Sequence, residues 1–539
     1  MYETACAVHL RHMNLQKYNA YPEYRPGQEK AVQDLLDAFQ RCQENGCNVT
    51  ELSAPVGSGK TIVLRSCGKA LLDIYPDEIT KVTYTTPLTS LVNQIKNDKM
   101  LKLPTVMGRS NYRCPTFPGL YADDCPYRSA ALAKKRPQSC RPCPYNRARS
   151  AFKESSFGAC TLDFYLYNHL ETDVLIVDES SSLEDRLLDN FGIALPEQID
   201  LQNLWNSIMD WMEVLEEEAE EYIERLEALN LNSSRRDLLN QIKDITKKLN
   251  TAQRTIAKCT RILRIIHEKH EFFIDSQRNF KLIRGTHPFN TMSKSVQFII
   301  MASGTPTTSL ICDNFLRVRA PHPIPVENRR VYYQPVGKMG RKQQDETIPA
   351  MAKKILQIHE TYPRSTIVHC HSYGIAKKLK ENMHHPAVLL QESGQRKEAL
   401  TDFMNAQECI FLSVNYSEGI DLKGDKFQRN LIAKVPYPNL VDEWVVKRNE
   451  ADKTKLKMDL WYRLSTAVDI QQASGRCTRD LNDYSETYIL DSNFGFFYKS
   501  NRDLFEPWFR EALVWDRDHK PTARVQPSEL VSKNEKRIM

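Results

Sequence analysis

The sequence predicts an α/β protein with buried, mostly parallel strands, divided into several domains. Short apolar runs rich in β-branched residues alternate with helical stretches along most of the chain, a pattern typical of parallel sheets with helices on both faces. The clearest runs are residues 82–85, 174–177, 298–301, 367–369 and 410–414. The chain has 539 residues, too many for one core, and we expect roughly three or four domains.

The composition is that of a folded, water-soluble protein, since 41% of the residues are apolar and 26% are charged. No run approaches the ~18 apolar residues that cross a bilayer. The first residues lack the basic and apolar regions of a secretion signal, so we expect no membrane contact and a cytoplasmic location, or a nuclear one in a eukaryote. The net charge of +6 permits binding to a polyanion without arguing for it.

Fourteen cysteines in such a chain indicate metal ligands, reactive thiols or small buried residues rather than disulfides. Four of them lie in a stretch of about residues 105–150 that breaks the α/β alternation and is rich in proline, arginine and lysine. They are Cys114, Cys125, Cys140 and Cys143. Four thiolates that include one C-x₂-C pair suit either an iron–sulfur cluster or Zn²⁺, and the spacing does not decide between them.

A second stretch, about residues 201–285, also breaks the alternation and is strongly helical. Two heptad seams separated by polar residues 230–234 predict an antiparallel helical hairpin. The seam positions include Ile208, Leu215, Ala219, Leu226, Ile242, Ile245, Leu249, Ala252, Cys259 and Leu263. The first helix is acidic and the second basic. Attraction between the two helices explains this division of charge, and a nucleic-acid role for the basic helix is the alternative.

A nucleotide site is predicted by the stretch that follows the strand-like residues 48–52, Ala54-Pro55-Val56-Gly57-Ser58-Gly59-Lys60-Thr61. In a phosphate loop, Gly57, Ser58 and Gly59 let backbone N–H groups converge on the phosphates. Lys60 neutralises the outer phosphates, and the hydroxyl of Thr61 reaches Mg²⁺. Ala54 stands where the general pattern has its first glycine, which leaves a chance match open for this motif alone.

Two carboxylates strengthen the prediction. Residues 174–177 form an apolar strand that runs directly into Asp178 and Glu179. Ligands of an open α/β sheet gather at the carboxyl ends of its strands. We therefore expect Asp178 to hold Mg²⁺ and Glu179 to orient and deprotonate the attacking water. A surface Asp-Glu pair is the alternative.

A third signal lies far along the chain, in Gln472-Ala473-Ser474-Gly475-Arg476-Cys477-Thr478-Arg479. Arg476 and Arg479 share one face if this segment is helical. Alone, such a pair indicates a solvated surface. Together with Lys60 and Glu179, it indicates a second domain that closes on the γ-phosphate.

This ordered set resembles the superfamily 2 helicases, and more closely their XPD/DinG branch, from about Tyr24 to Leu490. Further motifs carry the resemblance. They are Tyr24-Arg25-Pro26-Gly27-Gln28, Thr85-Thr86-Pro87 (motif Ia), Ser303-Gly304-Thr305, Val368-His369-Cys370-His371-Ser372-Tyr373 (motif IV), Ser417-Glu418-Gly419-Ile420-Asp421 (motif V) and Gln472 to Arg479 (motif VI). The resemblance implies that Arg25 and Gln28 contact the adenine end of ATP, that motif Ia contacts nucleic acid, and that Gly419, Asp421 and Gln472 belong to the ATP site.

The same branch carries a [4Fe–4S] domain and an arch domain in the two slots that the cysteine stretch and the hairpin occupy here. The resemblance therefore implies a cluster held by the four cysteines, in preference to zinc. It also implies two RecA-like lobes with both insertions in the first. The expected domains are lobe 1 (1–104, 151–195 and 286–308), the 4Fe–4S domain (105–150), the arch-like hairpin (196–285), lobe 2 (309–525) and a loose tail (526–539).

The implied function is that of an ATP-dependent DNA helicase, 5′ to 3′ in direction, that translocates on single-stranded DNA as a monomer and opens forked DNA, with an RNA–DNA hybrid as a further possible target. DNA repair is one pathway typical of the branch.

The family's Asp-Glu-Ala-His is here Asp178-Glu179-Ser180-Ser181, and Gly304 replaces an alanine. Both departures concern coupling of hydrolysis to movement. They motivate the alternative of a single-strand-dependent ATPase that remodels nucleoprotein without efficient unwinding; a redox-responsive DNA-binding module is a second alternative.

Overall fold

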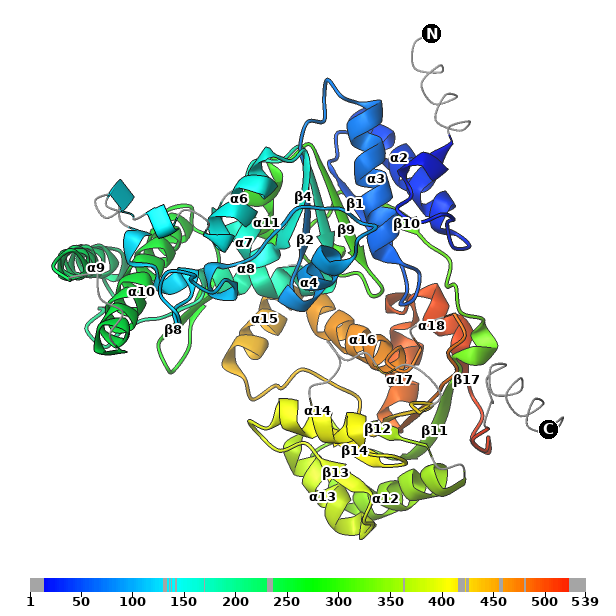
Figure 1. Ribbon diagram of the computed structural model, residues 1–539. Helices are drawn as coiled ribbons and strands as arrows, with labels where there is room; N and C mark the ends of the chain where they lie inside the picture. The colour runs from blue at the N-terminus through cyan, green and yellow to red at the C-terminus, as the bar shows by residue number, and fades with distance from the viewer. Residues whose placement is uncertain are drawn as a thin grey trace, which may run out of the picture.

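Two parallel seven-stranded sheets form two lobes in the computed structural model, and a helical hairpin projects from the first lobe (Figure 1). The structure describes residues 14–128, 133–134, 136, 138–140, 143–168, 170–229, 236–361, 364–414, 422, 426–454, 459–478 and 481–522. The predicted α/β class with two RecA-like lobes is confirmed. None of the helices within those ranges has the length and apolar character needed to cross a membrane.

The first sheet has the strand order β10-β1-β9-β5-β2-β4-β3, and every pairing is parallel. Its strands are β1 (Val49–Ser53), β2 (Val82–Thr86), β3 (Thr105–Val106), β4 (Phe157–Thr161), β5 (Val174–Asp178), β9 (Phe298–Ser303) and β10 (Leu316–Arg319). Its covering helices are α2 (Gln28–Asn45), α3 (Lys60–Ile74), α4 (Thr89–Asn97), α6 (Pro144–Glu154), α7 (Leu162–Asn168), α8 (Leu183–Phe191) and α11 (Thr286–Ser293). Helices α2 and α3 pack on one face and α6, α7, α8 and α11 on the other, which buries the central strands entirely.

The expected boundary between the lobes, at residues 308/309, lies too early in the chain, because strand β10 belongs to the first sheet. This strand pairs in parallel with β1, so the first lobe extends to Arg319. The carboxylate of Glu51, fully buried in β1, forms an ion pair with Arg317 of β10, and a buried charge requires such a partner. Because β10 is short and largely exposed, its sequence resembles a linker more than a core strand.

The second sheet has the order β13-β14-β12-β15-β16-β11-β17, again with parallel pairings. Its strands are β11 (Val331–Gly337), β12 (Thr366–His369), β13 (Val388–Leu390), β14 (Ile410–Ser413), β15 (Arg429–Ile432), β16 (Glu486–Asp491) and β17 (Leu513–Val514). Its helices are α12 (Gln344–Thr361), α13 (Tyr373–Met383), α14 (Arg396–Asn405), α15 (Glu443–Thr454), α16 (Leu460–Ser474), α17 (Asn493–Ser500) and α18 (Pro507–Ala512). The expected loose tail lies outside the described residues.

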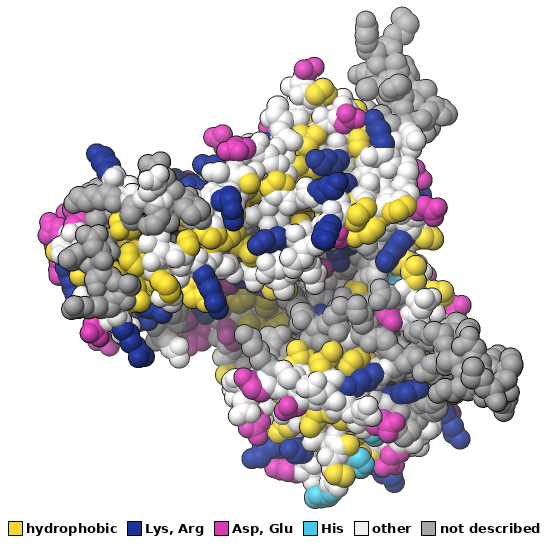
Figure 2. All heavy atoms as spheres, in the orientation of Figure 1, with side chains coloured by type: hydrophobic (Ala, Val, Ile, Leu, Met, Phe, Trp, Pro, Cys, Tyr) yellow, Lys and Arg dark blue, Asp and Glu magenta, His cyan; other side chains and the backbone are white. Residues whose placement is uncertain are grey.

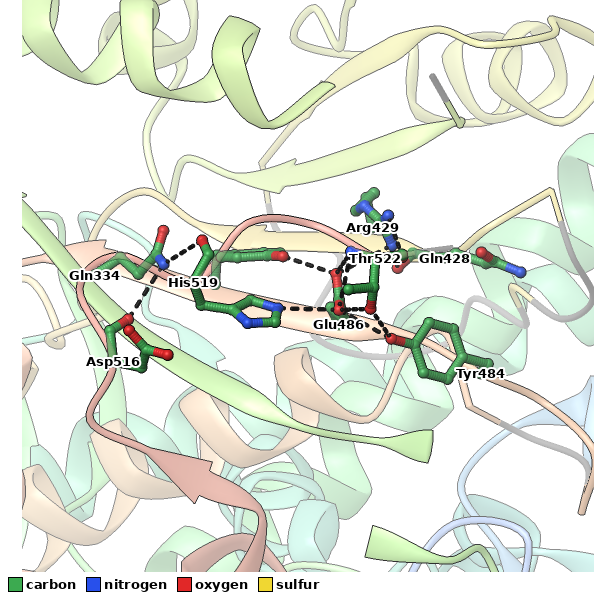
Figure 3. A network of polar contacts seen from close by, with 9 residues as sticks. Gln334, Gln428, Arg429, Tyr484, Glu486, Asp516, His519 and Thr522 are labelled. Atoms are coloured by element: carbon green, nitrogen blue, oxygen red, sulfur yellow. Dashed lines mark hydrogen bonds and ion pairs between the residues drawn. The ribbon is translucent and has the colours of Figure 1, made fainter. Parts of the chain in front are cut away.

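A polar network holds the segment after β17 against this sheet (Figure 3). The fully buried carboxylate of Glu486 lies 3.3 Å from Arg429 Nη1, and it accepts hydrogen bonds from Tyr488 and Thr522. Burial opposes ionisation, but Arg429 and these donors outweigh it and hold the pKa of Glu486 below its ordinary value. The network gathers side chains at the amino ends of β15 and β16, and we assign it a structural role.

The predicted hairpin is formed by α9 (Leu204–Glu227) and α10 (Arg236–His267), which pack against each other. A small sheet of β6 (Ile193–Ala194), β8 (Asn279–Leu282) and β7 (Phe272–Ile274) lies at its root. The predicted seam is confirmed, because its ten positions named above are buried. The six other predicted seam positions are half-buried; they are Met212, Tyr222, Leu229, Leu238, Ile256 and Ile266. Figure 1 shows the two helices side by side at the edge of the molecule.

The basic helix of the hairpin does not pair with the acidic one, contrary to the attraction we expected. No ion pair links described residues of α9 to described residues of α10. Instead, Arg254 forms an ion pair with Asp123 (3.2 Å), and Lys258 and Arg261 donate to carbonyl oxygens at the end of α8. Cations near a helix C-terminus satisfy its free carbonyl groups. The basic charge of α10 therefore joins the hairpin to its neighbours.

The hairpin also shares a hydrophobic core with the cysteine segment (residues 105–150). Phe117, Leu120 and Tyr127 of that segment pack with Leu215 and Leu249 of the two helices. Asn250 adds a hydrogen bond of 3.0 Å to the carbonyl oxygen of Asp123. The two expected insertions therefore form one structural unit.

The lobes are joined along α15 by buried charges and apolar side chains. The guanidinium of Arg448, which is 1% exposed, lies 3.1 Å from Glu184 of α8 and contacts the carbonyl oxygen of Ile283. Asp452 pairs with Arg284 of the first lobe at 3.0 Å. The core of the first lobe continues across the joint through Val445, Trp461, Leu464 and Val468 of the second.

We predict that Arg448→Ala lowers the free energy of unfolding by about 3 to 5 kcal/mol, because it leaves Glu184 buried without its cation and Asp452 with Arg284 alone. Lys447→Ala, which removes an exposed pair with Glu450, serves as the matched control and should change stability by less than about 1 kcal/mol. Urea unfolding followed by tryptophan fluorescence measures both. Equal effects of the two substitutions would contradict a joint that depends on the buried charges.

Candidate active site

The predicted phosphate loop connects β1 to α3, at the carboxyl edge of the first sheet. Gly57 and Gly59 have φ angles of 81° and 71°, in the left-handed region that favours glycine. Gly59 is the N-cap of α3, so Lys60 and Thr61 begin the helix. The backbone N–H groups of that first turn have no partners within the helix and are suited to bind an anion.

Gln28 holds this loop in place. Its side-chain Nε2 donates to the carbonyl oxygen of Ser58 (2.9 Å), and its Oε1 accepts from the backbone N–H of Arg25 (2.9 Å). A Cβ atom added to Gly59 would lie 2.2 Å from Gln28 Nε2, so only glycine permits this approach. Arg25 itself reaches the carbonyl oxygen of Gly57 at 3.5 Å. Contact of Arg25 and Gln28 with adenine stays a prediction.

Asp178 and Glu179 meet Lys60 at the same edge. Asp178 ends β5 and is buried, whereas the side chain of Glu179 is 40% exposed. Lys60 Nζ lies 2.9 Å from Glu179 Oε1. Glu179 has a left-handed backbone conformation (φ 54°), and its N–H donates to Asp178 Oδ1 (2.9 Å). The structure thus brings Lys60 to two predicted residues that lie more than a hundred positions further along the chain.

Tyr84 on β2 is a member of this site that the sequence analysis missed. Its hydroxyl donates to Asp178 Oδ2 at 2.5 Å. Burial and the neighbouring Glu179 raise the pKa of Asp178 to about 6, although Lys60 and Tyr84 oppose the rise. The signal available in the sequence was a run of hydroxyl-bearing residues, Thr83 to Thr86, in a strand that is buried throughout.

The second lobe reaches the phosphate loop through the end of α16. Gly475 has no side chain, and a methyl group there would lie 3.8 Å from Val56 of the loop. Gln472 Nε2 donates to Thr305 Oγ1 (3.1 Å) and lies 3.4 Å from Ser181 Oγ. Motif VI of the second lobe therefore contacts Ser181, which replaces the family's histidine. It also contacts Thr305, which directly follows Gly304, the second departure from the family pattern.

Arg476 is buried in the second lobe beside His369 of motif IV. Burial and the neighbouring Arg476 lower the pKa of His369 to about 4, although the hydrogen bond that His369 Nε2 donates to Asn430 Oδ1 opposes this. His369 is therefore neutral at physiological pH. The contact of Arg476 with a phosphate stays a prediction. Arg479 and motif V, with Gly419 and Asp421, lie outside the described residues.

Motif Ia occupies the end of β2 and the loop that follows. Thr85 and Thr86 are buried, and the hydroxyl of Thr85 donates to the carbonyl oxygen of Ile176 (2.8 Å). Exposed side chains begin at Leu88, followed by Thr89 and Ser90 at the start of α4. Contact between this segment and nucleic acid stays a prediction.

The four predicted metal-ligating cysteines line one cavity of about 110 Å³. All four are free thiols, and Cys143 is the N-cap of α6. Burial raises the pKa of Cys125, an effect that Arg136 opposes. Cys140 Sγ lies 3.0 Å from Thr116 Oγ1. The donor set suits a thiolate-bound metal centre.

The four sulfur atoms are not gathered as tightly as a single tetrahedral ion would hold them. Although all four cysteines lie among the described residues, no three of their sulfur atoms come within 4.8 Å of one another. With Zn–S bonds of 2.3 Å, tetrahedral zinc requires sulfur atoms roughly 3.8 Å apart. A larger iron–sulfur cluster uses a wider cage.

Comparisons with known proteins agree with this geometry. A family model described as "Helicase C-terminal domain" matches residues 355–512. The regulator of telomere elongation helicase 1 homolog of Drosophila yakuba is 25% identical over 243 residues, which cover 38% of this chain and 25% of that protein. The chain thus spans about a quarter of the length of this curated relative.

Two solved structures share the fold. The S. tokodaii Xpd4 structure has a TM-score of 0.55 at 18% identity, and covers 91% of this chain and 100% of its own. A structure titled XPD helicase has a TM-score of 0.59 at 16% identity, and covers 90% and 98%. The resemblance to superfamily 2 helicases of the XPD type is confirmed, and the chain has their two-lobed fold.

We predict that Asp178→Asn stabilises the nucleotide-free protein at high pH. A raised folded-state pKa means that the carboxyl group contributes stability below its ordinary pKa of 3.8, and that this contribution is lost as the pH rises through about 6. The asparagine variant should therefore gain about 2 to 3 kcal/mol on wild type between pH 4 and pH 8. Thermal melts across this range measure the gain. Asp77→Asn, an exposed control, should show no such pH dependence, and a gain that is flat with pH would refute the assignment.

Proposed function

We propose that this chain is an ATP-hydrolysing motor that moves along single-stranded DNA and separates duplex ahead of it. One observation carries the proposal: Lys60, Asp178 and Glu179 gather at a sheet edge that Gln472 and Gly475 of the other lobe contact. A nucleotide bound there touches both lobes. Its binding and hydrolysis would therefore open and close the cleft between them.

The ion pair between Lys60 and Glu179 suggests how ATP prepares its own hydrolysis. Lys60 Nζ lies 2.9 Å from Glu179 Oε1. The outer phosphates of ATP would draw the ammonium group away, because they carry more charge than one carboxylate. Glu179 would then be available to deprotonate water, with Asp178 and Thr61 at the Mg²⁺ that neutralises the phosphates. Arg476 and Arg479 would complete the site from the second lobe, with Arg25 and Gln28 at the adenine end and Gly419 and Asp421 nearby.

Surface charge supports a nucleic-acid track on the first lobe. Figure 2 shows Lys and Arg side chains spread across the face of this lobe. Lys96, Lys99 and Lys102, at and after the end of α4, are exposed, as is Arg113 at the start of the cysteine segment. Such residues neutralise phosphates without reading sequence. The relatives are named as helicases. We propose forked DNA as the substrate, 5′ to 3′ travel and a monomeric motor.

We further propose that Cys114, Cys125, Cys140 and Cys143 hold a [4Fe–4S] cluster. The shared cavity and the wide spacing of the sulfur atoms support this assignment over zinc. When bound, the cluster would cross-link segments that carry little regular structure. Because the cysteine segment shares a core with the hairpin, the cluster would also stiffen the hairpin beside the duplex junction.

A translocase that does not unwind is the second candidate function. Ser181 stands in the position of the family's histidine, and its hydroxyl lies at the long distance of 3.4 Å from Gln472. A weak link there would uncouple hydrolysis from strand separation.

We expect Glu179→Gln to lower ATP turnover on single-stranded DNA by about 10²- to 10⁴-fold, since the variant lacks the general base. Glu171→Gln, an exposed glutamate of the same lobe, is the matched control and should retain full activity. A coupled phosphate-release assay measures both. Wild-type turnover in Glu179→Gln would overturn the catalytic assignment.

Strand separation on forks with a 5′ or a 3′ tail then distinguishes the two functions. Opening of the 5′-tailed fork alone supports the helicase with the proposed direction. Turnover on single strands without opening of either fork supports the translocase.

The anaerobically purified protein should be brown and contain about four irons per chain. Cys125→Ser should lose the visible absorbance and most of the iron. Cys312→Ser, outside the cavity, should keep both. Stoichiometric zinc in a colourless wild-type protein would exclude the cluster.

A further inference from the structure

We propose that Glu268, His270 and His287 form a second metal site, specific for a zinc-like divalent cation, at the root of the hairpin. Their ligand atoms all lie within 4.8 Å of one another. Glu268 Oε2 lies 3.1 Å from His270 Nε2 and 3.5 Å from His287 Nε2. Metal bonds of 2.0–2.1 Å place tetrahedral ligands roughly 3.3 Å apart, so both separations match the edge of one coordination sphere.

The backbone brings the first two ligands to the same side of the chain. Helix α10 ends in a turn in which Lys269 is left-handed (φ 56°) and the N–H of His270 donates to the carbonyl oxygen of Ile265 (3.0 Å). This closure of a helix normally uses glycine at the left-handed position. It reverses the chain between Glu268 and His270, so that their side chains meet. His287 comes from the first turn of α11 in the first lobe.

The stacked rings of His270 and His287 and the charges around them bear on how a cation would be held. The two rings lie with their centroids 3.6 Å apart, and coordination opens this stack so that both nitrogens face one ion. Arg264 and Lys294 oppose a cation here, whereas the carboxylate of Glu268 attracts it.

The donor set selects the class of metal. Two imidazoles and one carboxylate suit Zn²⁺ and its transition-metal neighbours, whereas Mg²⁺ and Ca²⁺ prefer oxygen ligands. The side chains of Glu268 and His270 are 42% and 35% exposed, which leaves room for water as a fourth ligand. The site is separate in sequence and in donor chemistry from the cysteine cavity.

A metal ion at this position would link the C-terminal end of α10 to the first lobe. Next to His287, the N–H of Gly285 donates to Glu184 (3.1 Å), and Arg284 pairs with Asp452 of the second lobe. The ion would therefore fasten the hairpin root to the residues that join the lobes. A ligand that binds only the folded state raises its melting temperature.

Cobalt titration of the chelator-treated full-length protein tests the site. Co²⁺ held by imidazole and carboxylate gives visible bands without the near-ultraviolet thiolate transition that the cysteines would add. We expect wild type to bind one Co²⁺ per chain of this type. His287→Asn should lose it, and Glu268→Gln, an exposed substitution that should not disturb folding, should bind it at least about tenfold more weakly. His384→Asn, at an exposed left-handed position that asparagine tolerates, is the control and should bind as wild type.

Zinc-dependent stability gives a second measurement. Zn²⁺ should raise the melting temperature of wild type and His384→Asn by several degrees more than that of Glu268→Gln. Identical cobalt spectra and affinities in wild type and Glu268→Gln, or an equal thermal response to zinc in both, would overturn the proposal. Because both measurements are made without ATP or DNA, their outcome is independent of the helicase activity.

Discussion

The contact between α16 and the phosphate loop is the interaction on which the rest of the candidate machinery depends. Gly475 lets the backbone of the second lobe approach Val56, and Gln472 reaches Thr305 and Ser181 from the same helix end. The phosphate loop is held in place for this contact, because Gln28 hydrogen-bonds to it and only glycine fits at position 59. A looser loop would separate the carboxylates from the second lobe.

The two lobes are joined unequally at the two sides of this contact. Beside α15 the joint is buried, with Arg448 enclosed between Glu184 and Asp452 and with apolar side chains continuous across it. Near the phosphate loop the described contacts are hydrogen bonds: Gln472 reaches Thr305 and Ser181 at 3.1 and 3.4 Å. Beside them Ser53 donates to Glu506 (2.7 Å), and Trp508 donates to the carbonyl oxygen of Gly304 (3.0 Å). Separation at the first side would expose charge and apolar surface together, whereas the second side loses only hydrogen bonds that water can replace. This asymmetry favours opening of the cleft about the α15 joint.

The hairpin is joined to the rest of the chain at its root and along the cysteine segment. Its helices bury side chains of the cysteine segment, and the basic residues of α10 bind the end of α8 and Asp123 instead of the acidic helix. The acidic side of α9 is thus left to solvent. Charge pattern alone could not reveal this, since it shows which residues are basic but not which of the neighbouring acceptors they meet.

The sequence by itself determined the α/β class, the buried strands, the hairpin seam and the membership of the phosphate site. Each depends on local pattern: continuous apolar runs, a heptad period, and glycines beside Lys60. Tertiary structure alone decided that Tyr84 bonds to Asp178, that β10 belongs to the first sheet, and that Gln28 binds the phosphate loop. It also brought His287 to Glu268 and His270. These contacts join residues distant in the chain through the packing of strands and helices, and no local period encodes which distant side chains will meet.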